Sequence, residues 1–265
     1  MEDKKIIRLY LLIVFSIIVP TCGIVLVLNV CGIQLQSSPY GLIPVAVGGL
    51  STAFAGAFIA KRSGKINSYI ELIKDFFRIK QPTIYYIITV SFLLFIFGSR
   101  ILQGQLREGQ NWLDILWIFI MSILFGGIEE IGWRYLFQPI LEKKLSFFVA
   151  SIITFALWGV WHLMFNVLDG SIFNMHTVSD IIWFLLFLMG ASYILGSIYN
   201  VTKSLWLCVF YHALLNAFSQ VFIGTTFIGN VMILAFSIAS SVLLVLHKSK
   251  ITKLIEAYSK NDYTH

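Results

Sequence analysis

Residues 113–137 read LDILWIFIMSILFGGIEEIGWRYLF, and this stretch decides the fold. It begins with a mostly apolar run of the kind that forms a bilayer-crossing helix, for which about 20 residues are needed. Two glycines, two carboxylates and an arginine follow directly. A helix that is apolar on all sides is buried in a large core or in a membrane. We therefore predict a membrane-spanning helix over Leu113–Phe137 that carries ionisable groups near its inner end.

The composition of the whole chain agrees with this prediction. The 265 residues are 58% hydrophobic and 12% charged, with a mean hydropathy of +0.85, whereas soluble domains carry about 25% charged residues. Soluble enzymes, disordered modules and disulfide-rich secreted domains are thereby excluded. The net charge of +6 comes from basic residues that flank apolar runs, so we expect membrane lipid, and no nucleic acid, as a partner. Cys22, Cys31 and Cys208 match no metal or redox spacing.

Apolar runs predict an all-α, polytopic membrane protein with one transmembrane domain over residues 1–265. Eight spans are expected, at Leu9–Val30, Tyr40–Ala60, Thr83–Leu102, Leu113–Phe137, Ser146–Leu168, Ile181–Tyr199, Leu205–Phe227 and Asn230–His247. The segment between the second and third spans, Ser63–Pro82, is either a short amphipathic helix on the membrane surface or a solvated basic loop.

The distribution of positive charge predicts the topology. With the amino terminus in the cytoplasm, 17 of the 19 Lys and Arg residues fall in inner segments, Lys260 of the tail among them. Arg100 and Arg107 are the two that fall outside. Because cytoplasmic loops carry the excess of Lys and Arg, the pattern favours eight helices with both termini cytoplasmic.

Ionisable side chains inside spans are the candidate functional residues, since insertion of each costs about 2.5–3.5 kcal/mol and such groups usually face a wet cavity or a partner. Glu130 and Arg134 are four residues apart in the favourable order for an ion pair. Glu129 points about 100° away around the helix, where its neighbour four residues on is Trp133. An adjacent carboxylate and partial desolvation would suit Glu129 to act as a general base. The alternative is a structural ion-pair network.

Two histidines and two asparagines complete the set. His162 lies in the fifth predicted span, and His212 and Asn216 lie in the seventh, on one helical face. His162 and Asn166 have the same spacing as His212 and Asn216, so spacing alone does not decide which asparagine belongs to the functional site. Each group taken alone is more often an interhelical hydrogen-bond partner. Together, a carboxylate pair, an arginine, two imidazoles and an amide provide a general base and oxyanion donors.

These motifs resemble those of the CAAX protease and bacteriocin-processing (CPBP, or Abi) family, which includes the type II CAAX prenyl proteases. The resemblance is carried by Glu129-Glu130-x-x-x-Arg134, an aromatic-x-x-x-His ending at His162, and His212-x-x-x-Asn216. It covers about 113–227. One position departs from the family pattern, because Trp158 stands where Phe is usual.

The resemblance implies an intramembrane endopeptidase in which Glu129 deprotonates a water and His162 assists. Glu130 and Arg134 would hold the helix end, and His212 and Asn216 would stabilise the oxyanion. The family is usually described as metal-dependent, so Glu129, His162 and His212 could hold a divalent metal such as zinc. A metal-free mechanism uses the same groups, and we favour it.

The sequence poses one geometric difficulty. In straight helices Glu129 lies about 12 Å above Phe137 and His162 about 24 Å above Ser146. For the two side chains to meet, either the fifth helix starts below the bilayer or Pro139–Phe148 dips and returns at the interface, and we predict the second. A separation of more than about 12 Å between these side chains would exclude a shared site.

Three functions compete at this point. The first is an intramembrane endopeptidase acting on a membrane-associated peptide or protein, in bacteriocin or peptide maturation and self-immunity or in prenyl-peptide cleavage. The second is a non-catalytic scaffold of the same fold that binds a membrane partner such as a sensor kinase. The third is a small transporter, against which the absence of an inverted repeat counts. Compact loops favour a bacterial plasma membrane.

Overall fold

The computed structural model describes residues 1–224 and 226–253, and every regular element in these ranges is helical. The chain is an all-α, multi-pass membrane protein. Seven helical segments among the described residues are long and apolar enough to cross a membrane. They are Asp3–Val30, Pro39–Ser63, Thr83–Leu102, Trp112–Glu129, Phe147–Leu168, Val178–Thr202 and Phe227–Leu246.

The seventh predicted span is shorter than the others. It forms α10 (Leu205–Val221), an apolar helix of 17 residues, which is about 25 Å long at 1.5 Å per residue. The prediction had extended this span to Phe227, across Thr225, which lies outside the described residues. The count of eight spans and the cytoplasmic location of the termini stay predictions.

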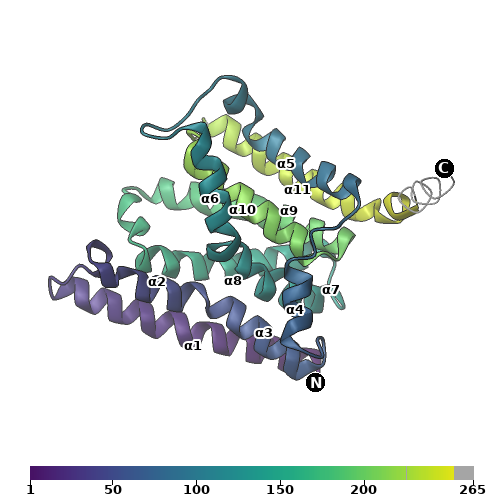
Figure 1. Cartoon of the computed structure of the whole chain (residues 1–265), viewed down its shortest axis with the longest axis horizontal. Helices are drawn as coiled ribbons and strands as arrows, with labels where there is room; N and C mark the ends of the chain where they lie inside the picture. The colour runs from purple at the N-terminus through teal and green to yellow at the C-terminus, as the bar shows by residue number, and fades with distance from the viewer. Residues whose placement is uncertain (225, 254–265) are drawn as a thin grey trace.

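The helices pack on one another across the molecule. In Figure 1 the long helices α1 (Asp3–Val30), α8 (Phe147–Leu168), α9 (Val178–Thr202) and α11 (Phe227–Leu246) follow one another across the molecule, each packed on the next. The α6 helix (Trp112–Phe125) packs along α10, and α5 (Thr83–Leu102) contacts both α10 and α11. The second predicted span consists of α2 (Leu42–Gly49) and α3 (Ser51–Ser63), which pack on α1.

The fourth predicted span is not one straight helix, and this corrects the sequence-based expectation. The α6 helix ends at Phe125, where Gly126 has φ −141° and ψ −56°. A 3₁₀ turn η3 (Gly127–Glu129), a π-helix η4 (Ile131–Phe137) and a short helix α7 (Gln138–Glu142) follow. All seven residues of η4 are buried. The motif-bearing segment therefore runs through the centre of the bundle.

Hydroxyl and amide caps explain where several helices begin. Asn111 and Asp114 form a capping box at the start of α6, and Thr177 and Asp180 form one at the start of α9. Ser146 and Ser204 cap α8 and α10. Such caps satisfy backbone N–H groups that a helix start leaves unpaired.

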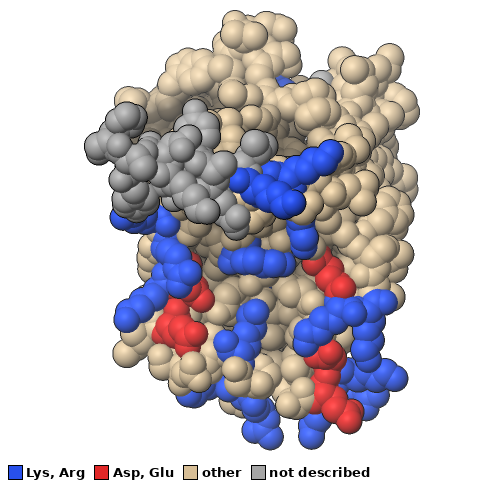
Figure 2. Space-filling view, turned by 90° about the vertical axis from the view of Figure 1, so that its right-hand side faces the viewer, with Lys and Arg blue, Asp and Glu red and all other residues tan. Residues whose placement is uncertain are grey.

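Positive charge gathers at one end of the molecule. The start of α1 and the end of α11 lie at the same end in Figure 1, and Figure 2 shows Lys and Arg side chains concentrated on that face. Lys61 and Arg62 end α3 there. Lys260, which the prediction placed on the same side, lies outside the described residues.

The segment Ser63–Pro82 contains a short helix, α4 (Tyr69–Phe76), which Ser68 caps. Its Leu72 and Phe76 are buried, while Ile70 and Ile73 are exposed. The hydroxyl of Tyr135 in η4 donates to Asp75 Oδ2 at 3.0 Å, which ties α4 to the motif-bearing segment.

Candidate active site

Two glycines bring the motif-bearing segment against α10. A Cβ on Gly126 would collide with Asn216 Nδ2 and lie 3.3 Å from His212 Nε2. A Cβ on Gly127 would lie 2.6 Å from Val209 Cγ1. Because neither glycine has a side chain, the backbone where α6 ends packs directly against α10. The polar ends of His212 and Asn216 consequently face the same point.

Glu130 lies in a fully buried charge cluster. Its Oε1 is 2.7 Å from His212 Nδ1 and 3.4 Å from the Arg134 guanidinium, and Glu130 and Arg134 are both 0% exposed. The predicted ion pair between Glu130 and Arg134 is therefore present, but the imidazole of His212 is the closer partner. Glu130 Oε2 has no hydrogen-bond partner among the described residues.

Arg134 is held by two further contacts. Its guanidinium donates to Ser192 Oγ on α9 at 3.2 Å. The guanidinium carbon lies 4.1 Å from the centre of the Trp158 ring, a cation–π geometry. The cation therefore links the π-helix to α8 and α9.

Glu129 is buried and bonded to a side chain of α8. Its Oε2 accepts a hydrogen bond of 2.9 Å from the Trp158 indole Nε1. The Trp158 ring in turn packs edge-on against His162, with ring centres 4.7 Å apart. Glu129 and His162 therefore contact the same indole. Their side chains are closer together than the separation of about 12 Å that would exclude a shared site.

The depth difficulty is reduced by the length of the helical segment that follows Glu129. The predicted distance assumed a helix that ends near Phe137, whereas the π-helix η4 is followed directly by α7, which ends at Glu142, and α8 begins at Phe147. The predicted dip of Pro139–Phe148 at the interface stays a prediction; in the structure Pro139 lies inside α7, and the turn to α8 follows it.

The hydrogen bonds of the two imidazoles define their free nitrogens. His162 Nδ1 lies 3.1 Å from the Trp158 carbonyl oxygen, which can only accept, so Nδ1 carries hydrogen and Nε2 is free. His212 Nδ1 faces the Glu130 carboxylate and carries hydrogen for the same reason. Both rings are oriented by their Nδ1 contacts, as catalytic and ligating histidines often are.

The structure separates the two asparagines. Asn216 has its Nδ2 against Gly126, next to His212. Asn166 is buried on α8, and its Nδ2 has no hydrogen-bond partner among the described residues. This geometry favours Asn216 as the amide of the site.

The residues present do not fit a metal site. Among residues 1–224 and 226–253, no three His, Cys, Asp or Glu side chains are grouped so that they could hold a metal ion. The proposed ligands explain why: Trp158 packs against both His162 and His212, and its indole occupies Glu129 Oε2. We therefore derive no step through a metal.

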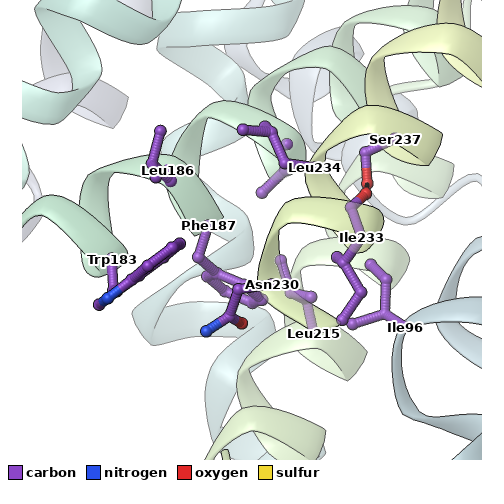
Figure 3. A pocket seen from close by; sticks show the side chains of 11 residues that line it. Ile96, Trp183, Leu186, Phe187, Leu215, Asn230, Ile233, Leu234 and Ser237 are labelled. Atoms are coloured by element: carbon purple, nitrogen blue, oxygen red, sulfur yellow. Dashed lines mark hydrogen bonds between the residues drawn. The ribbon is translucent and has the colours of Figure 1, made fainter. Parts of the chain in front are cut away.

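A pocket lies beside the site rather than in it. Figure 3 shows it between α5, α9, α10 and α11, with Trp183, Phe187 and Asn230 at one side and Ser237 at the other. Leu215, the neighbour of Asn216, lines it, but none of the six candidate residues does.

Comparison with known proteins finds a similarity over the motif-bearing core. Residues 110–218, which contain all six candidate residues, match the family model "Type II CAAX prenyl endopeptidase Rce1-like". Over this core, the chain is similar to the CAAX protease family. A CAAX prenyl protease 2 from Methanococcus maripaludis is 31% identical over 137 residues, 49% of this chain and 50% of that protein. The chain therefore spans about half the length of the relative that it matches.

Sequence reasoning missed three features of the candidate site. It did not foresee that Trp158 donates to Glu129, that Ser192 contacts Arg134, or that Gly126 lies between Asn216 and His212. The replacement of the usual Phe by Trp158 was a signal, because an indole brings a donor that a phenyl ring lacks. The Ser192 contact left no pattern in the sequence.

Proposed function

We propose that this chain is an intramembrane endopeptidase that hydrolyses a peptide bond of a membrane-associated peptide or protein. The observation that carries the proposal is the arrangement around Trp158. Glu129 and His162 lie on it, the Glu130–His212 pair packs beside it, and Asn216 faces the same backbone break as His212. The family of residues 110–218 supports the same reaction class.

In the proposed reaction Glu129 takes a proton from a water molecule, with His162 Nε2 as the assisting acceptor. The water oxygen bonds to the peptide carbonyl carbon, the C–N bond breaks, and the departing nitrogen receives the proton. The Asn216 amide donates to the developing oxyanion. For His212 Nε2 to donate as well, the ring must carry both protons, and Glu130 at 2.7 Å supplies the compensating charge.

The proposed substrate reaches the site within or beside the membrane, and the proposed setting is a bacterial plasma membrane. We propose maturation of a membrane-bound peptide, such as a bacteriocin, or removal of the end of a lipid-modified protein. The name of the archaeal relative, a CAAX prenyl protease, makes a prenylated CAAX peptide the first probe to use.

The test is a cleavage assay with purified protein in nanodiscs. The probes are a prenylated CAAX peptide and an unmodified membrane-spanning peptide, each with and without a chelator. We expect Glu129→Ala and His212→Ala to reduce turnover by about 10²-fold or more, since each removes a proton-transfer or oxyanion group. Glu108→Ala and His176→Ala, which change exposed residues of the predicted outer loops, serve as matched controls.

The outcomes separate the candidate functions. Equal processing by wild type and both site variants would refute the site. Binding of a probe without cleavage by the wild type would favour the scaffold alternative. Loss of cleavage with chelator and its recovery with zinc would overturn the metal-free mechanism.

A further inference from the structure

The side chain of Trp158 lies at the centre of the candidate site and contacts most of its members. It is 1% exposed. Its indole N–H donates to Glu129 at 2.9 Å, and its ring packs against His162 and His212 with ring centres 4.7 and 5.7 Å away. The Arg134 guanidinium lies over its face at 4.1 Å. One residue thus contacts four of the six candidate groups.

The orientation of Glu129 depends on this contact. Glu129 ends the 3₁₀ turn η3, next to the break at Gly126. Among the described residues, the hydrogen-bond partner of the Glu129 carboxylate is the indole N–H of Trp158. A side chain with several rotatable bonds needs such a partner to be held in one direction, because fixing it costs rotamer entropy.

We infer that Trp158 is a positioning residue, which holds the Glu129 carboxylate through its indole N–H while its ring spaces the two imidazoles. The inference rests on the proposed function. Since Oε2 is occupied by the indole, Oε1 is the oxygen left to take a proton from water. The contact also stabilises the ionised carboxylate, because a hydrogen bond to a charged group favours that form.

The same helix provides a matched control. Trp161, 0% exposed, is also on α8, packs on His162 with ring centres 4.9 Å apart, and donates its indole N–H at 3.0 Å to a neutral partner, Ser51 Oγ. A change that removes the N–H at position 161 therefore perturbs the core in a similar way without touching a carboxylate of the site.

The first measurement does not require activity. The chain is labelled with ¹⁵N-tryptophan in nanodiscs, and the indole N–H resonances of residues 158 and 161 are assigned with Trp158→Phe and Trp161→Phe. We expect Glu129→Ala to shift the Trp158 indole resonance and to leave that of Trp161 in place. An unchanged Trp158 resonance would overturn the inference.

The second measurement isolates the N–H from the shape of the ring. Benzothienylalanine, which replaces the indole N–H by sulfur, is incorporated at position 158 or at position 161. At 158 we expect kcat for the prenylated probe to fall about 10-fold, with KM within about twofold. We also expect the acid limb of the kcat profile to move about one unit to higher pH. At position 161, we expect kcat and its pH profile to stay as in wild type.

The outcomes distinguish this inference from the proposed function. If wild type cleaves and Glu129→Ala does not, but the analogue at position 158 leaves kcat and the pH profile unchanged, the positioning role is wrong and the hydrolase stands. If wild type cleaves no probe, the proposed function falls and the positioning role falls with it, whatever the resonances show.

Discussion

At the scale of single residues, the centre of this molecule is a buried group of charges that must compensate one another. Glu130 contacts both His212 and Arg134, and neither Glu130 nor Arg134 is exposed. Removal of one member of a buried pair leaves the other charge without a partner in a medium of low dielectric constant. The group is therefore a stability requirement as well as a candidate oxyanion device.

We predict that Glu130→Gln lowers the free energy of unfolding by about 3–5 kcal/mol, because Arg134 is left buried and uncompensated. Chemical denaturation in detergent micelles measures this. The control is Asp3→Asn, which breaks the partly exposed Asp3–Lys143 pair of 2.7 Å and should cost less than about 1 kcal/mol. Similar losses for both variants would contradict the prediction.

The sequence predicted part of this group. The spacing of Glu130 and Arg134 indicated their ion pair, since four residues span one helical turn. The closer contact, to His212, joins residues 82 positions apart, and no local pattern carries such information. Likewise, the exchange of Phe for Trp158 was visible, but its bond to Glu129 depends on how α8 faces the break in the fourth span.

At the scale of elements, the π-helix η4 is positioned by helices that precede the family core. A Cβ on Gly56 of α3 would lie 2.7 Å from Gly132 Cα and 2.8 Å from its backbone nitrogen. The two backbones are therefore in direct contact, and Trp161 of α8 also donates to Ser51 of α3. The second predicted span, which carries no catalytic motif, thus supports the motif-bearing segment.

We predict that Gly56→Ala destabilises the protein by about 1–3 kcal/mol, because backbone atoms must move to admit the methyl group. Gly98→Ala is the control. Gly98 lies inside α5 with nothing within 4 Å of the added Cβ, so alanine there should stabilise by about 0.5–1 kcal/mol. Thermal unfolding of both variants in detergent measures the two effects. Equal shifts in Tm would contradict the prediction that the backbone contact with α3 positions η4.

Helix positions were predictable from the sequence, whereas the internal form of the fourth span was not. The apolar run and the cap Asn111 indicate where α6 begins. The expected straight helix to Phe137 was wrong, because Gly126 and Gly127 stop it and the π-helix that follows departs from the 3.6-residue period on which pattern reasoning depends.

At the scale of the whole molecule, the separation of charge predicts the orientation in the membrane. Lys and Arg concentrate at the end where α1 begins and α11 ends (Figures 1 and 2). The positive-inside rule predicts that this end faces the cytoplasm. Cys31, at the opposite end of α1, is exposed, whereas Cys22 and Cys208 are buried.

We predict that a membrane-impermeant maleimide labels Cys31 in intact cells, and that Cys31→Ser abolishes this labelling. In the Cys31→Ser background, Lys144→Cys places a thiol at an exposed position of the predicted inner face and should react only after permeabilisation. Labelling of Lys144→Cys in intact cells would contradict the predicted topology and indicate the opposite orientation.

The central claim is that acid and imidazole groups from different spans act on one reacting bond. A double-mutant cycle of Glu129→Ala and His212→Ala tests it most directly, with kcat/KM for cleavage of one peptide as the readout. Because groups that serve one transition state are strongly non-additive, we predict that the double variant is about as slow as the slower single variant. The claim would be contradicted if the fold losses in kcat/KM of the two single variants multiply in the double variant. It would also be contradicted if the single variants are as fast as wild type.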